Sequence, residues 1–437
     1  MASFQKDIFS VGVSKFLIIT FGILTSVITA RTLGAEKNGV IAALLVYPSL
    51  FMTIGSLGIR QSTTYFIGKK IYPEKDIKTA VTQIWILSTA FCLISSYFLI
   101  TEFSKSGEDK VLVLLALIPI PFTLFNTYNS GVFLGKNQIQ AFNKINWYPP
   151  LLILILTFLL VYLLNGGIKG YMIALIIGPL FIFVFLLFKN KFTEAFSIKL
   201  NLKIIKSMLS LGLAYALALL IINLNTRLDI ILLDKLSSQY EVGIYSKGAV
   251  LAQYVWQIPM LLGTIIFARS ALERKNDNKI SVKVTQILRL SIVFVGFGLI
   301  CLFVFSPTII IGLYGNEFRG SISVLRILTL GVFVMTLFKS MNQDMAGKGK
   351  PWVSMKAMIP ALIVNIILNL LFIPEHGANG ASLASTISYT IAGILFLHFY
   401  SKEVKISIKE ILKYKKTDFD PILLIIKSKI KNNENSK

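Results

Sequence analysis

The densest group of polar side chains inside an apolar stretch of the sequence is Asn223, Asn225, Arg227, Asp229 and Asp234. At about 100° per residue, a helix places Asn223, Arg227 and Asp234 near one face and the other two roughly 200° away. Arg227 and Asp229 therefore cannot form a same-face pair. A guanidinium stays charged and matches phosphate geometry, so Arg227 is the leading candidate to hold an anionic group. The alternative is an arginine that reaches the membrane interface or pairs between helices.

Other polar residues in apolar stretches leave two interpretations open. Asp229 is either a helix-packing partner or a site for a cation or proton. Lys339, Gln253 and Gln257 have polar neighbours at helical spacing, and they either bind hydroxyl groups of a substrate or form hydrogen bonds to adjacent helices. No His, Cys, Asp or Glu residues show a metal-ligand spacing, and no phosphate-binding glycine loop of the Gly-x-x-x-x-Gly-Lys-Ser/Thr type occurs. We therefore expect no metal and no ATP hydrolysis by this chain, and we expect no prosthetic group.

Composition identifies the environment that holds these residues. The chain has 437 residues, of which 55% are hydrophobic and 15% are charged, whereas soluble domains have roughly 25% charged residues. This excludes a soluble globular protein, and the 32 Phe and 16 Tyr exclude a disordered one. Cys92 and Cys301 lie in apolar runs, so no disulfide framework is expected. The net charge of +23 is not gathered into a basic, aromatic stripe, so no nucleic-acid partner is expected.

The elements that position the polar groups are membrane-spanning helices. A helix of about 20 apolar residues is long enough to cross the hydrocarbon core, and the polar groups lie in apolar stretches of about this length. The sequence predicts an all-α polytopic membrane protein with twelve spans, at approximately 8–30, 41–66, 80–100, 111–134, 148–165, 170–188, 207–233, 246–268, 287–311, 324–345, 357–374 and 380–400. The first span has no cleavage site after it and is expected to be retained. With both termini in the cytoplasm, 34 Lys and Arg lie on the inner side and 9 on the outer side. The positive-inside rule supports this orientation.

An internal repeat organises the spans. Gly167–Ala174 and Gly377–Ala384 share the pattern G-x-x-G-x-x-x-A, and segments Leu33–Gly39 and Leu236–Gly243 occupy the predicted loop after the first span of each half. An even number of spans per half predicts parallel repeats related by an axis along the membrane normal. The expected domains are a six-helix lobe at 1–195, a second six-helix lobe at 196–401 and a basic cytoplasmic tail at 402–437.

The tail has two interpretations. Its lysines alternate with Ile406, Ile408, Ile411 and Leu412, which is typical of a basic helix on a membrane surface. A frayed tail that only enforces orientation is the alternative.

Six segments together resemble the polysaccharide-transporter branch of the multidrug/oligosaccharidyl-lipid/polysaccharide (MOP) superfamily, most closely the O-antigen repeat-unit flippases. They are Ala30–Val40, Leu228–Leu233, Val242–Ser246, Leu313–Phe318, Asn365–Asn369 and Gly377–Ala384. The resemblance covers nearly all of residues 1–400. It implies a V-shaped pair of six-helix lobes and an oligosaccharide linked by pyrophosphate to undecaprenol, moved to the outer leaflet of a bacterial cytoplasmic (inner) membrane by alternating access.

The resemblance also gives the remaining basic candidates a role. Lys15 and Arg60 fall in the cytoplasmic third, where a lipid diphosphate would enter, although both could instead reach the interface. Expected partners are the lipid-linked oligosaccharide and membrane lipid, with a polysaccharide polymerase and chain-length machinery as further candidates. The competing function is a cation-coupled exporter of small drugs, which would need a carboxylate-rich cavity. A glycan polymerase or acyltransferase is less favoured, because neither a large outer loop nor a suitable intramembrane His is present, and the protein is not expected to be an enzyme.

Overall fold

The computed structural model describes residues 2–418 except 137, 198–200, 261–262, 264–265, 268–269, 271–278 and 416–417. Within these residues the protein is all-α, without strands. Eight helical segments are long and apolar enough to cross a membrane. Five of them are single helices, namely α3 (Glu74–Phe103), α8 (Gly167–Lys189), α9 (Leu202–Leu236), α13 (Lys279–Val304) and α15 (Ser321–Gly347).

Two helices are each long enough for two spans. α1 (Ala2–Gly55) contains one residue with non-helical backbone, Gly34, at φ 78°. α16 (Trp352–Val404) contains another, Gly377, at φ 50°. The segments predicted as a loop around 31–40 and as a turn near 376 are therefore kinks within helices. Positive φ values favour glycine, so each break between the two parts of these helices falls at a glycine.

The other spans are assembled from shorter helices. α2 (Ile59–Gly68) continues the second part of α1 after the left-handed Gly58. α4 (Lys110–Leu117) is followed by α5 (Pro119–Gly135), and α7 (Tyr148–Thr157) by the π-helical η2 (Phe158–Leu163). α10 (Gln239–Tyr254) and α11 (Gln257–Met260) begin the eighth predicted span, whose remainder lies partly outside the described residues. With α1 and α16 counted as two spans each, these segments account for the twelve predicted spans.

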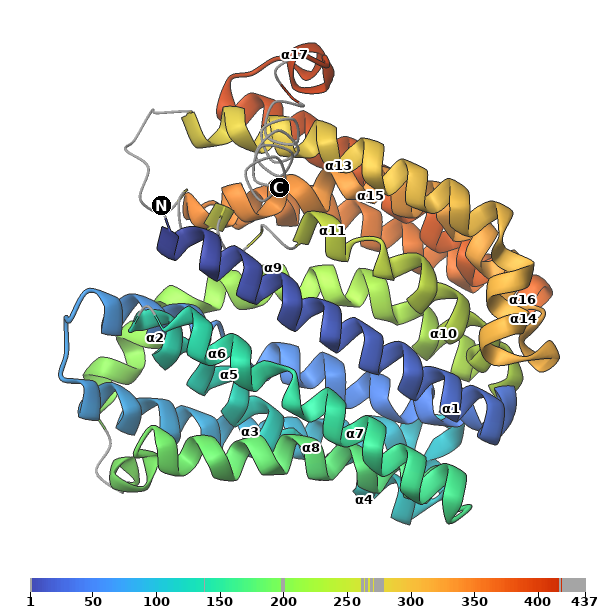
Figure 1. Cartoon of the computed structure of the whole chain (residues 1–437), viewed down its shortest axis with the longest axis horizontal. Coiled ribbons are helices and arrows are strands. Elements are labelled where there is room, and N and C mark those ends of the chain that lie inside the picture. Colours follow the sequence, from blue (N-terminus) through green and yellow to red (C-terminus); the bar gives the residue numbers. More distant parts are fainter. Residues whose placement is uncertain are drawn as a thin grey trace, which may run out of the picture.

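Short elements connect the spans. They are η1 (Lys105–Glu108), α6 (Ile139–Asn146), η3 (Phe192–Ala195), α14 (Ser306–Tyr314) and η4 (Asn316–Phe318), and α17 (Ile408–Leu412) follows the last span. In Figure 1, α2 to α8 form the lower part of the bundle and α13 to α16 the upper part. α1 lies between them and contacts both α9 and α10. The predicted boundary at 195–196 falls between η3 and α9.

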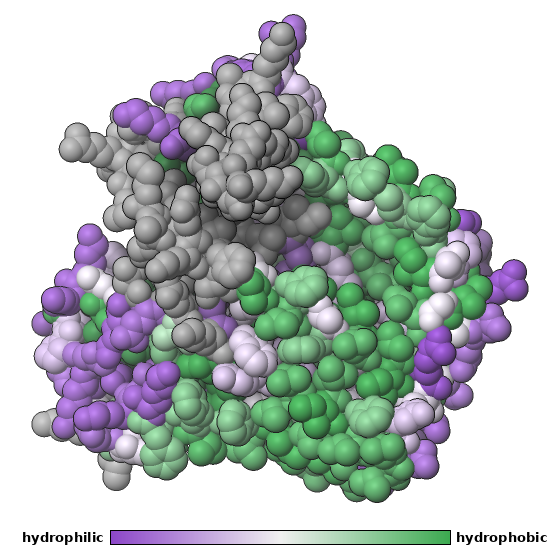
Figure 2. Space-filling model, in the orientation of Figure 1, coloured by the Kyte–Doolittle hydropathy of each residue, from purple (hydrophilic) through white to green (hydrophobic). Residues whose placement is uncertain are grey.

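The surface agrees with a membrane environment. A broad apolar belt covers the helices between two polar ends (Figure 2). Large side chains such as Phe297, which is 70% exposed, and Leu87, which is 66% exposed, contribute to the exposed apolar surface. An exposed apolar surface of this extent is stable in contact with lipid and not in contact with water. The chain is a multi-pass membrane protein.

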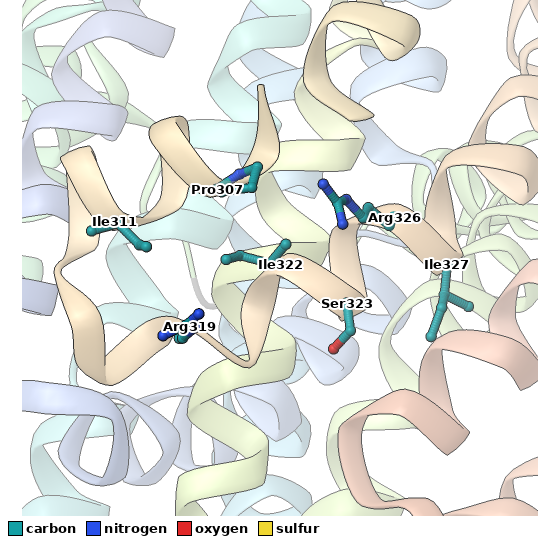
Figure 3. Close-up of a pocket in the computed structure, with 7 residues that line it drawn as sticks. All are labelled: Pro307, Ile311, Arg319, Ile322, Ser323, Arg326 and Ile327. Atoms are coloured by element: carbon teal, nitrogen blue, oxygen red, sulfur yellow. The ribbon is translucent and has the colours of Figure 1, made fainter. Parts of the chain in front are cut away.

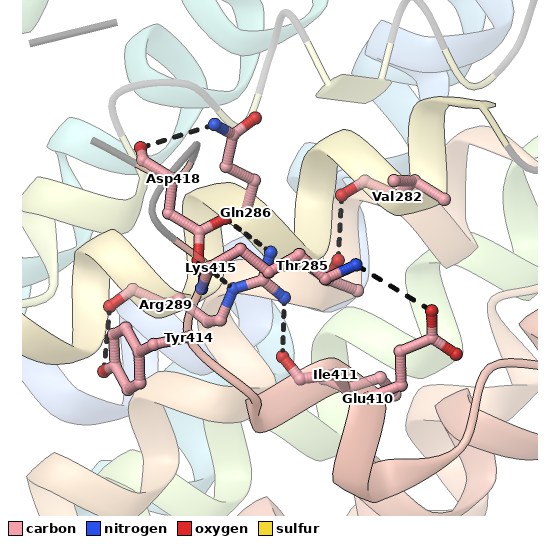
Figure 4. Close-up of polar contacts among 9 residues, drawn as sticks. All are labelled: Val282, Thr285, Gln286, Arg289, Glu410, Ile411, Tyr414, Lys415 and Asp418. Atoms are coloured by element: carbon pink, nitrogen blue, oxygen red, sulfur yellow. Dashed lines mark hydrogen bonds and ion pairs between the residues drawn. The ribbon is translucent and has the colours of Figure 1, made fainter. Parts of the chain in front are cut away.

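The tail folds back onto α13 (Figure 4). The Arg289 guanidinium donates from Nε to Asp418 Oδ2 at 2.7 Å and from Nη2 to Asp418 Oδ1 at 2.6 Å. A third donation joins Nη1 to the carbonyl of Ile411, whose side chain is fully buried. The amphipathic helix predicted here is thus only five residues long, and its buried isoleucine packs on protein. Residues 416–417 and 419–437 of the predicted tail lie outside the described residues.

Candidate functional site

Asp229 is the centre of a buried hydrogen-bond network that joins three helices. Its Oδ1 accepts from Asn365 Nδ2 at 3.2 Å and from Asn369 Nδ2 at 2.8 Å, both on α16. Its Oδ2 accepts from the hydroxyls of Tyr245 on α10 and Ser385 on α16, each at 2.6 Å. The side chain has no exposed surface. Four donors therefore surround this carboxylate, and it ties α9 to α10 and α16.

Arg227 does not pair with Asp229, as the helical spacing predicts. Its side chain is exposed, and the described residues give it neither a hydrogen bond nor an ion pair. It is near enough to Tyr245 and Tyr389 to interact with them electrostatically. Both tyrosines are almost completely buried. The guanidinium thus lies beside interior residues of α10 and α16. Asn223, the predicted neighbour of Arg227, donates to the Leu219 carbonyl of its own helix at 2.9 Å.

Lys339, on α15, is linked to the surroundings of Arg227 through two aromatic rings. Its Nζ lies 4.8 Å from the ring centroid of Trp256, in the turn after α10. The Trp256 ring lies 5.6 Å from that of Tyr389, and its Nε1 donates to the Val332 carbonyl at 2.9 Å. Arg227 thus interacts electrostatically with Tyr389, whose ring packs against that of Trp256, and Trp256 in turn contacts Lys339. The predicted Gln253 and Gln257 flank this turn and are both half-buried.

Lys15 on α1 and Arg60 on α2 form a second basic group. Their charges are close enough to interact with one another. Both side chains are half-buried. Two like charges that interact repel each other, so Lys15 and Arg60 together create a positive potential within the first six spans. In the described part of the chain, no cluster of three or more His, Cys, Asp or Glu could hold a metal ion.

A contact that sequence reasoning missed lies where the chain turns at Gly34. The backbone N–H of Ala35 donates to Glu317 Oε1 at 2.7 Å. Arg31 Nε donates to the Leu313 carbonyl at 2.9 Å, and Arg31 Nη2 also contacts the carbonyl of Gly312. These bonds join α1 to α14 and η4. Residues 30–40 and 313–318 both stood out in the sequence, but nothing in their spacing paired them.

Lys247 reinforces this contact from α10. Its Nζ donates to Ser26 Oγ at 3.0 Å and to Thr29 Oγ1 at 3.2 Å, both on α1. We call the end of the bundle that carries these bonds the Gly34 end. Here the first six spans and the later spans are joined by several polar contacts.

Gly377 repeats the arrangement found at Gly34. The N–H of the next residue, Ala378, donates to Glu241 Oε2 at 2.7 Å. In both cases a carboxylate accepts from the first free N–H after a glycine of positive φ, which is a favourable place for negative charge. Gly167, the sequence counterpart of Gly377, also has positive φ, at 60°.

Contacts join the same two groups of spans at the opposite end, which we call the Tyr72 end; Figure 1 places α2 and α14 at opposite ends of the bundle. The Tyr72 hydroxyl lies 3.4 Å from Ser207 Oγ on α9. A Cβ added to Gly58 would lie 2.4 Å from the Gly212 carbonyl oxygen, so only glycine allows α2 and α9 to approach this closely. Contacts between the groups therefore exist at both ends.

Comparison with known proteins agrees with this architecture. A family model described as "Polysaccharide biosynthesis protein" matches residues 28–323. The capsular polysaccharide biosynthesis protein CapF of Staphylococcus aureus is 23% identical over 366 residues, covering 82% of this chain and 89% of CapF.

Two solved structures share the fold. The lipid II flippase MurJ in an inward closed conformation aligns with TM-score 0.75 and 18% identity, covering 96% of this chain and 92% of that one. An inward-facing MATE-family multidrug transporter of the MOP superfamily aligns with TM-score 0.73 and 13% identity, covering 90% and 94%. The chain accordingly belongs to the polysaccharide biosynthesis protein family.

Proposed function

We propose that this protein is a flippase that moves a lipid-linked oligosaccharide, an O-antigen repeat unit or a similar polysaccharide unit on undecaprenyl pyrophosphate, across a bacterial cytoplasmic membrane. The proposed lobes are 1–195 and 196–401, which alternate in opening at the Gly34 end and the Tyr72 end. Family membership supports a role in polysaccharide production. The membrane-spanning fold supports transport as the means.

The observation that carries the proposal is the imbalance of charge within the spans. Lys15, Arg227 and Lys339 form no ion pair with a carboxylate in the described residues. Asp229, by contrast, already accepts from four donors and has no exposed surface. Charges retained in a span usually face a partner or a wet cavity. Unpaired cations favour an anionic diphosphate over the cationic drugs of the competing exporter.

In this proposal, different side chains bind different parts of the substrate. Arg227 and Lys339 hold phosphate oxygens, with Lys15 and Arg60 attracting the diphosphate as it enters. Trp256 and Tyr389 offer ring faces against which a sugar can pack, while Asn223, Gln253 and Gln257 are the proposed hydrogen-bonding groups. An inside-negative potential supplies about 2.3 kcal/mol per charge per 100 mV for outward movement. A polysaccharide polymerase and chain-length machinery would act on the product.

Reconstitution distinguishes the two functions. The purified chain is placed in vesicles that contain a short glycan on undecaprenyl pyrophosphate in the inner leaflet, and an impermeant lectin reports glycan that reaches the outer leaflet. We expect faster appearance than in protein-free vesicles, with no change in phosphatidylcholine exchange. Vesicles that extrude a cationic dye against a sodium or proton gradient, but leave the glycan lipid in place, would establish the exporter instead.

A further inference from the structure

A pocket separate from the polar groups above lies between α14, η4 and the start of α15 (Figure 3). Its volume is about 480 Å³. The lining combines two arginines and a serine with apolar side chains, principally Arg319, Arg326, Ser323, Ile311, Ile322 and Ile327. A pocket with charged and apolar walls suits a ligand that is itself amphipathic.

Arg326 is held in place at the pocket wall. Its Nε donates to Ser306 Oγ at 2.8 Å and to the Phe303 carbonyl at 3.3 Å. The guanidinium carbon lies 5.3 Å from the centroid of the Phe303 ring. These contacts leave both Nη atoms without a hydrogen-bond partner in the described part of the chain. A guanidinium fixed through one nitrogen and a ring keeps its fork available to an anion.

Arg319 supplies a second positive charge. It is exposed and, among residues whose positions are described, has no side-chain hydrogen bond or ion pair. The nearest acidic residue in sequence, Glu317, directs its Oε1 to the N–H of Ala35 instead. Ser323 is also engaged, because its hydroxyl contacts Asn379 Oδ1 at 2.7 Å. The positive charge of the pocket is therefore not neutralised by its own walls.

The surroundings place the pocket at the edge of the apolar belt. Phe303, Val304 and Phe305, at the end of α13, are each about half exposed. Asn316 and Arg319, which follow α14, are polar and exposed. Arginine and aromatic side chains are typical of this depth, where phospholipid headgroups meet the first acyl methylenes. Only 9 basic residues are predicted on this side of the membrane, and two of them line one pocket.

We propose that this pocket binds an anionic phospholipid, with Arg319 and Arg326 at the headgroup phosphate and the isoleucines against the start of an acyl chain. The ligand is a structural lipid of the leaflet at the Gly34 end. This inference needs the membrane-spanning fold but not the proposed substrate. Since α14 and η4 also provide Leu313 and Glu317 to the contacts with α1, a lipid here would stabilise that end of the bundle.

The test uses the full chain in a maltoside detergent with added dioleoyl phosphatidylglycerol or phosphatidylcholine. Bound lipid is counted by native mass spectrometry, and thermal unfolding is followed in parallel. We expect the parent to retain phosphatidylglycerol in preference to phosphatidylcholine and to unfold at a higher temperature with it. The double variant R319Q/R326Q should bind phosphatidylglycerol roughly tenfold more weakly, as expected when two charge-assisted contacts are lost.

Matched variants separate specific binding from general effects. K110Q/K169Q removes two exposed charges from the same predicted side and should bind phosphatidylglycerol like the parent. R319K/R326K keeps both charges and should recover part of the binding even if the glutamine variant folds poorly. Equal binding of both lipids by the parent would overturn the proposal, as would unchanged phosphatidylglycerol binding in folded R319Q/R326Q. Equal stabilisation by inorganic phosphate would assign the pocket to a free anion and would also overturn it.

Discussion

The Oε1 atom of Glu317 accepts a hydrogen bond of 2.7 Å from the backbone N–H of Ala35, across 282 residues of sequence. This bond connects the later spans to the turn at Gly34. A Cβ on Gly34 would lie 2.7 Å from the same oxygen, so the carboxylate fits closely only against glycine. In the alternating access proposed above, this contact has to break whenever the Gly34 end opens.

We predict that Glu317→Ala favours the open Gly34 end. The reporter is Ala30→Cys, at a position that is 2% exposed, in a background lacking Cys92 and Cys301. An impermeant maleimide should label this cysteine several-fold faster when the carboxylate is removed, because one charge-assisted bond of about 1.5 to 3 kcal/mol is lost. Glu375→Ala, at an exposed carboxylate near the Gly377 kink, is the control and should leave the rate unchanged. Equal rates in Glu317→Ala and parent would mean that the bond does not hold this end closed.

We predict that Asp229→Asn destabilises the fold. The amide keeps the shape of the carboxylate but presents an NH₂ donor to groups that already donate. One buried donor left without an acceptor costs about 1 to 3 kcal/mol. The thermal unfolding midpoint in detergent should fall, and Tyr245→Phe should add little in the double variant because the two residues share one network. Asn223→Ala, which loses only a bond within its own helix, should unfold near the parent temperature. A full additive loss for Asp229 and Tyr245 would refute the shared network.

Sequence reasoning predicted the spans because apolar length is a local property. It also separated Arg227 from Asp229, since helical geometry alone places them on different faces. The hydrogen-bond partners of Asp229 could not be predicted in this way. Asn365 and Ser385 lie on a helix more than 130 residues away in sequence, and local patterns do not indicate how that helix packs. The kink at Gly34 was predicted as a loop, because the sequence does not indicate that Glu317, a tertiary partner, accepts from the Ala35 N–H. Asn38 adds a local contact, since its Nδ2 donates to the carbonyls of Thr29 and Gly34.

We predict that tail docking weakens in acid. Two hydrogen bonds from Arg289 hold the pKa of Asp418 below its ordinary value. A carboxyl with a lowered folded pKa contributes stability that is complete above the unfolded value, about 4, and is lost as the pH falls through the folded value. Limited pepsin digestion should therefore release the segment after Tyr400 faster as the pH decreases below about 4.

Asp418→Asn isolates this pair from general effects of acid. At neutral pH it should expose Lys413 and Lys415 to trypsin several-fold faster than in the parent. Glu410→Gln is the matched control, because Glu410 lies 3.9 Å from Lys415 in an exposed pair. Parent-like cleavage of Asp418→Asn would show that the buried Ile411 alone holds the tail.

We predict cytoplasmic placement of both termini, from the 34 to 9 distribution of basic residues. Reporter fusions after Lys75, Gly107 and Glu375 should report inside, outside and outside, respectively. Lys75 lies in the first turn of α3, close in sequence to Tyr72, whereas Glu375 adjoins Gly377 at the Gly34 end. A cytoplasmic signal at Gly107 would reverse the orientation and with it the proposed direction of transport.

We predict that the charge of Arg227 is required for glycan export. Arg227 is exposed beside the buried Tyr245 and Tyr389 and has no carboxylate partner in the described residues, so it is available to a diphosphate. Arg227→Ala should abolish outer-leaflet appearance of the glycan in cells that make normal amounts of the variant. Arg227→Lys should keep part of it, since an ammonium preserves the charge but loses the bidentate geometry. Parent-like export by Arg227→Ala would make the residue structural, and the same substitution at Lys15, Arg60 and Lys339 would then locate the anion site.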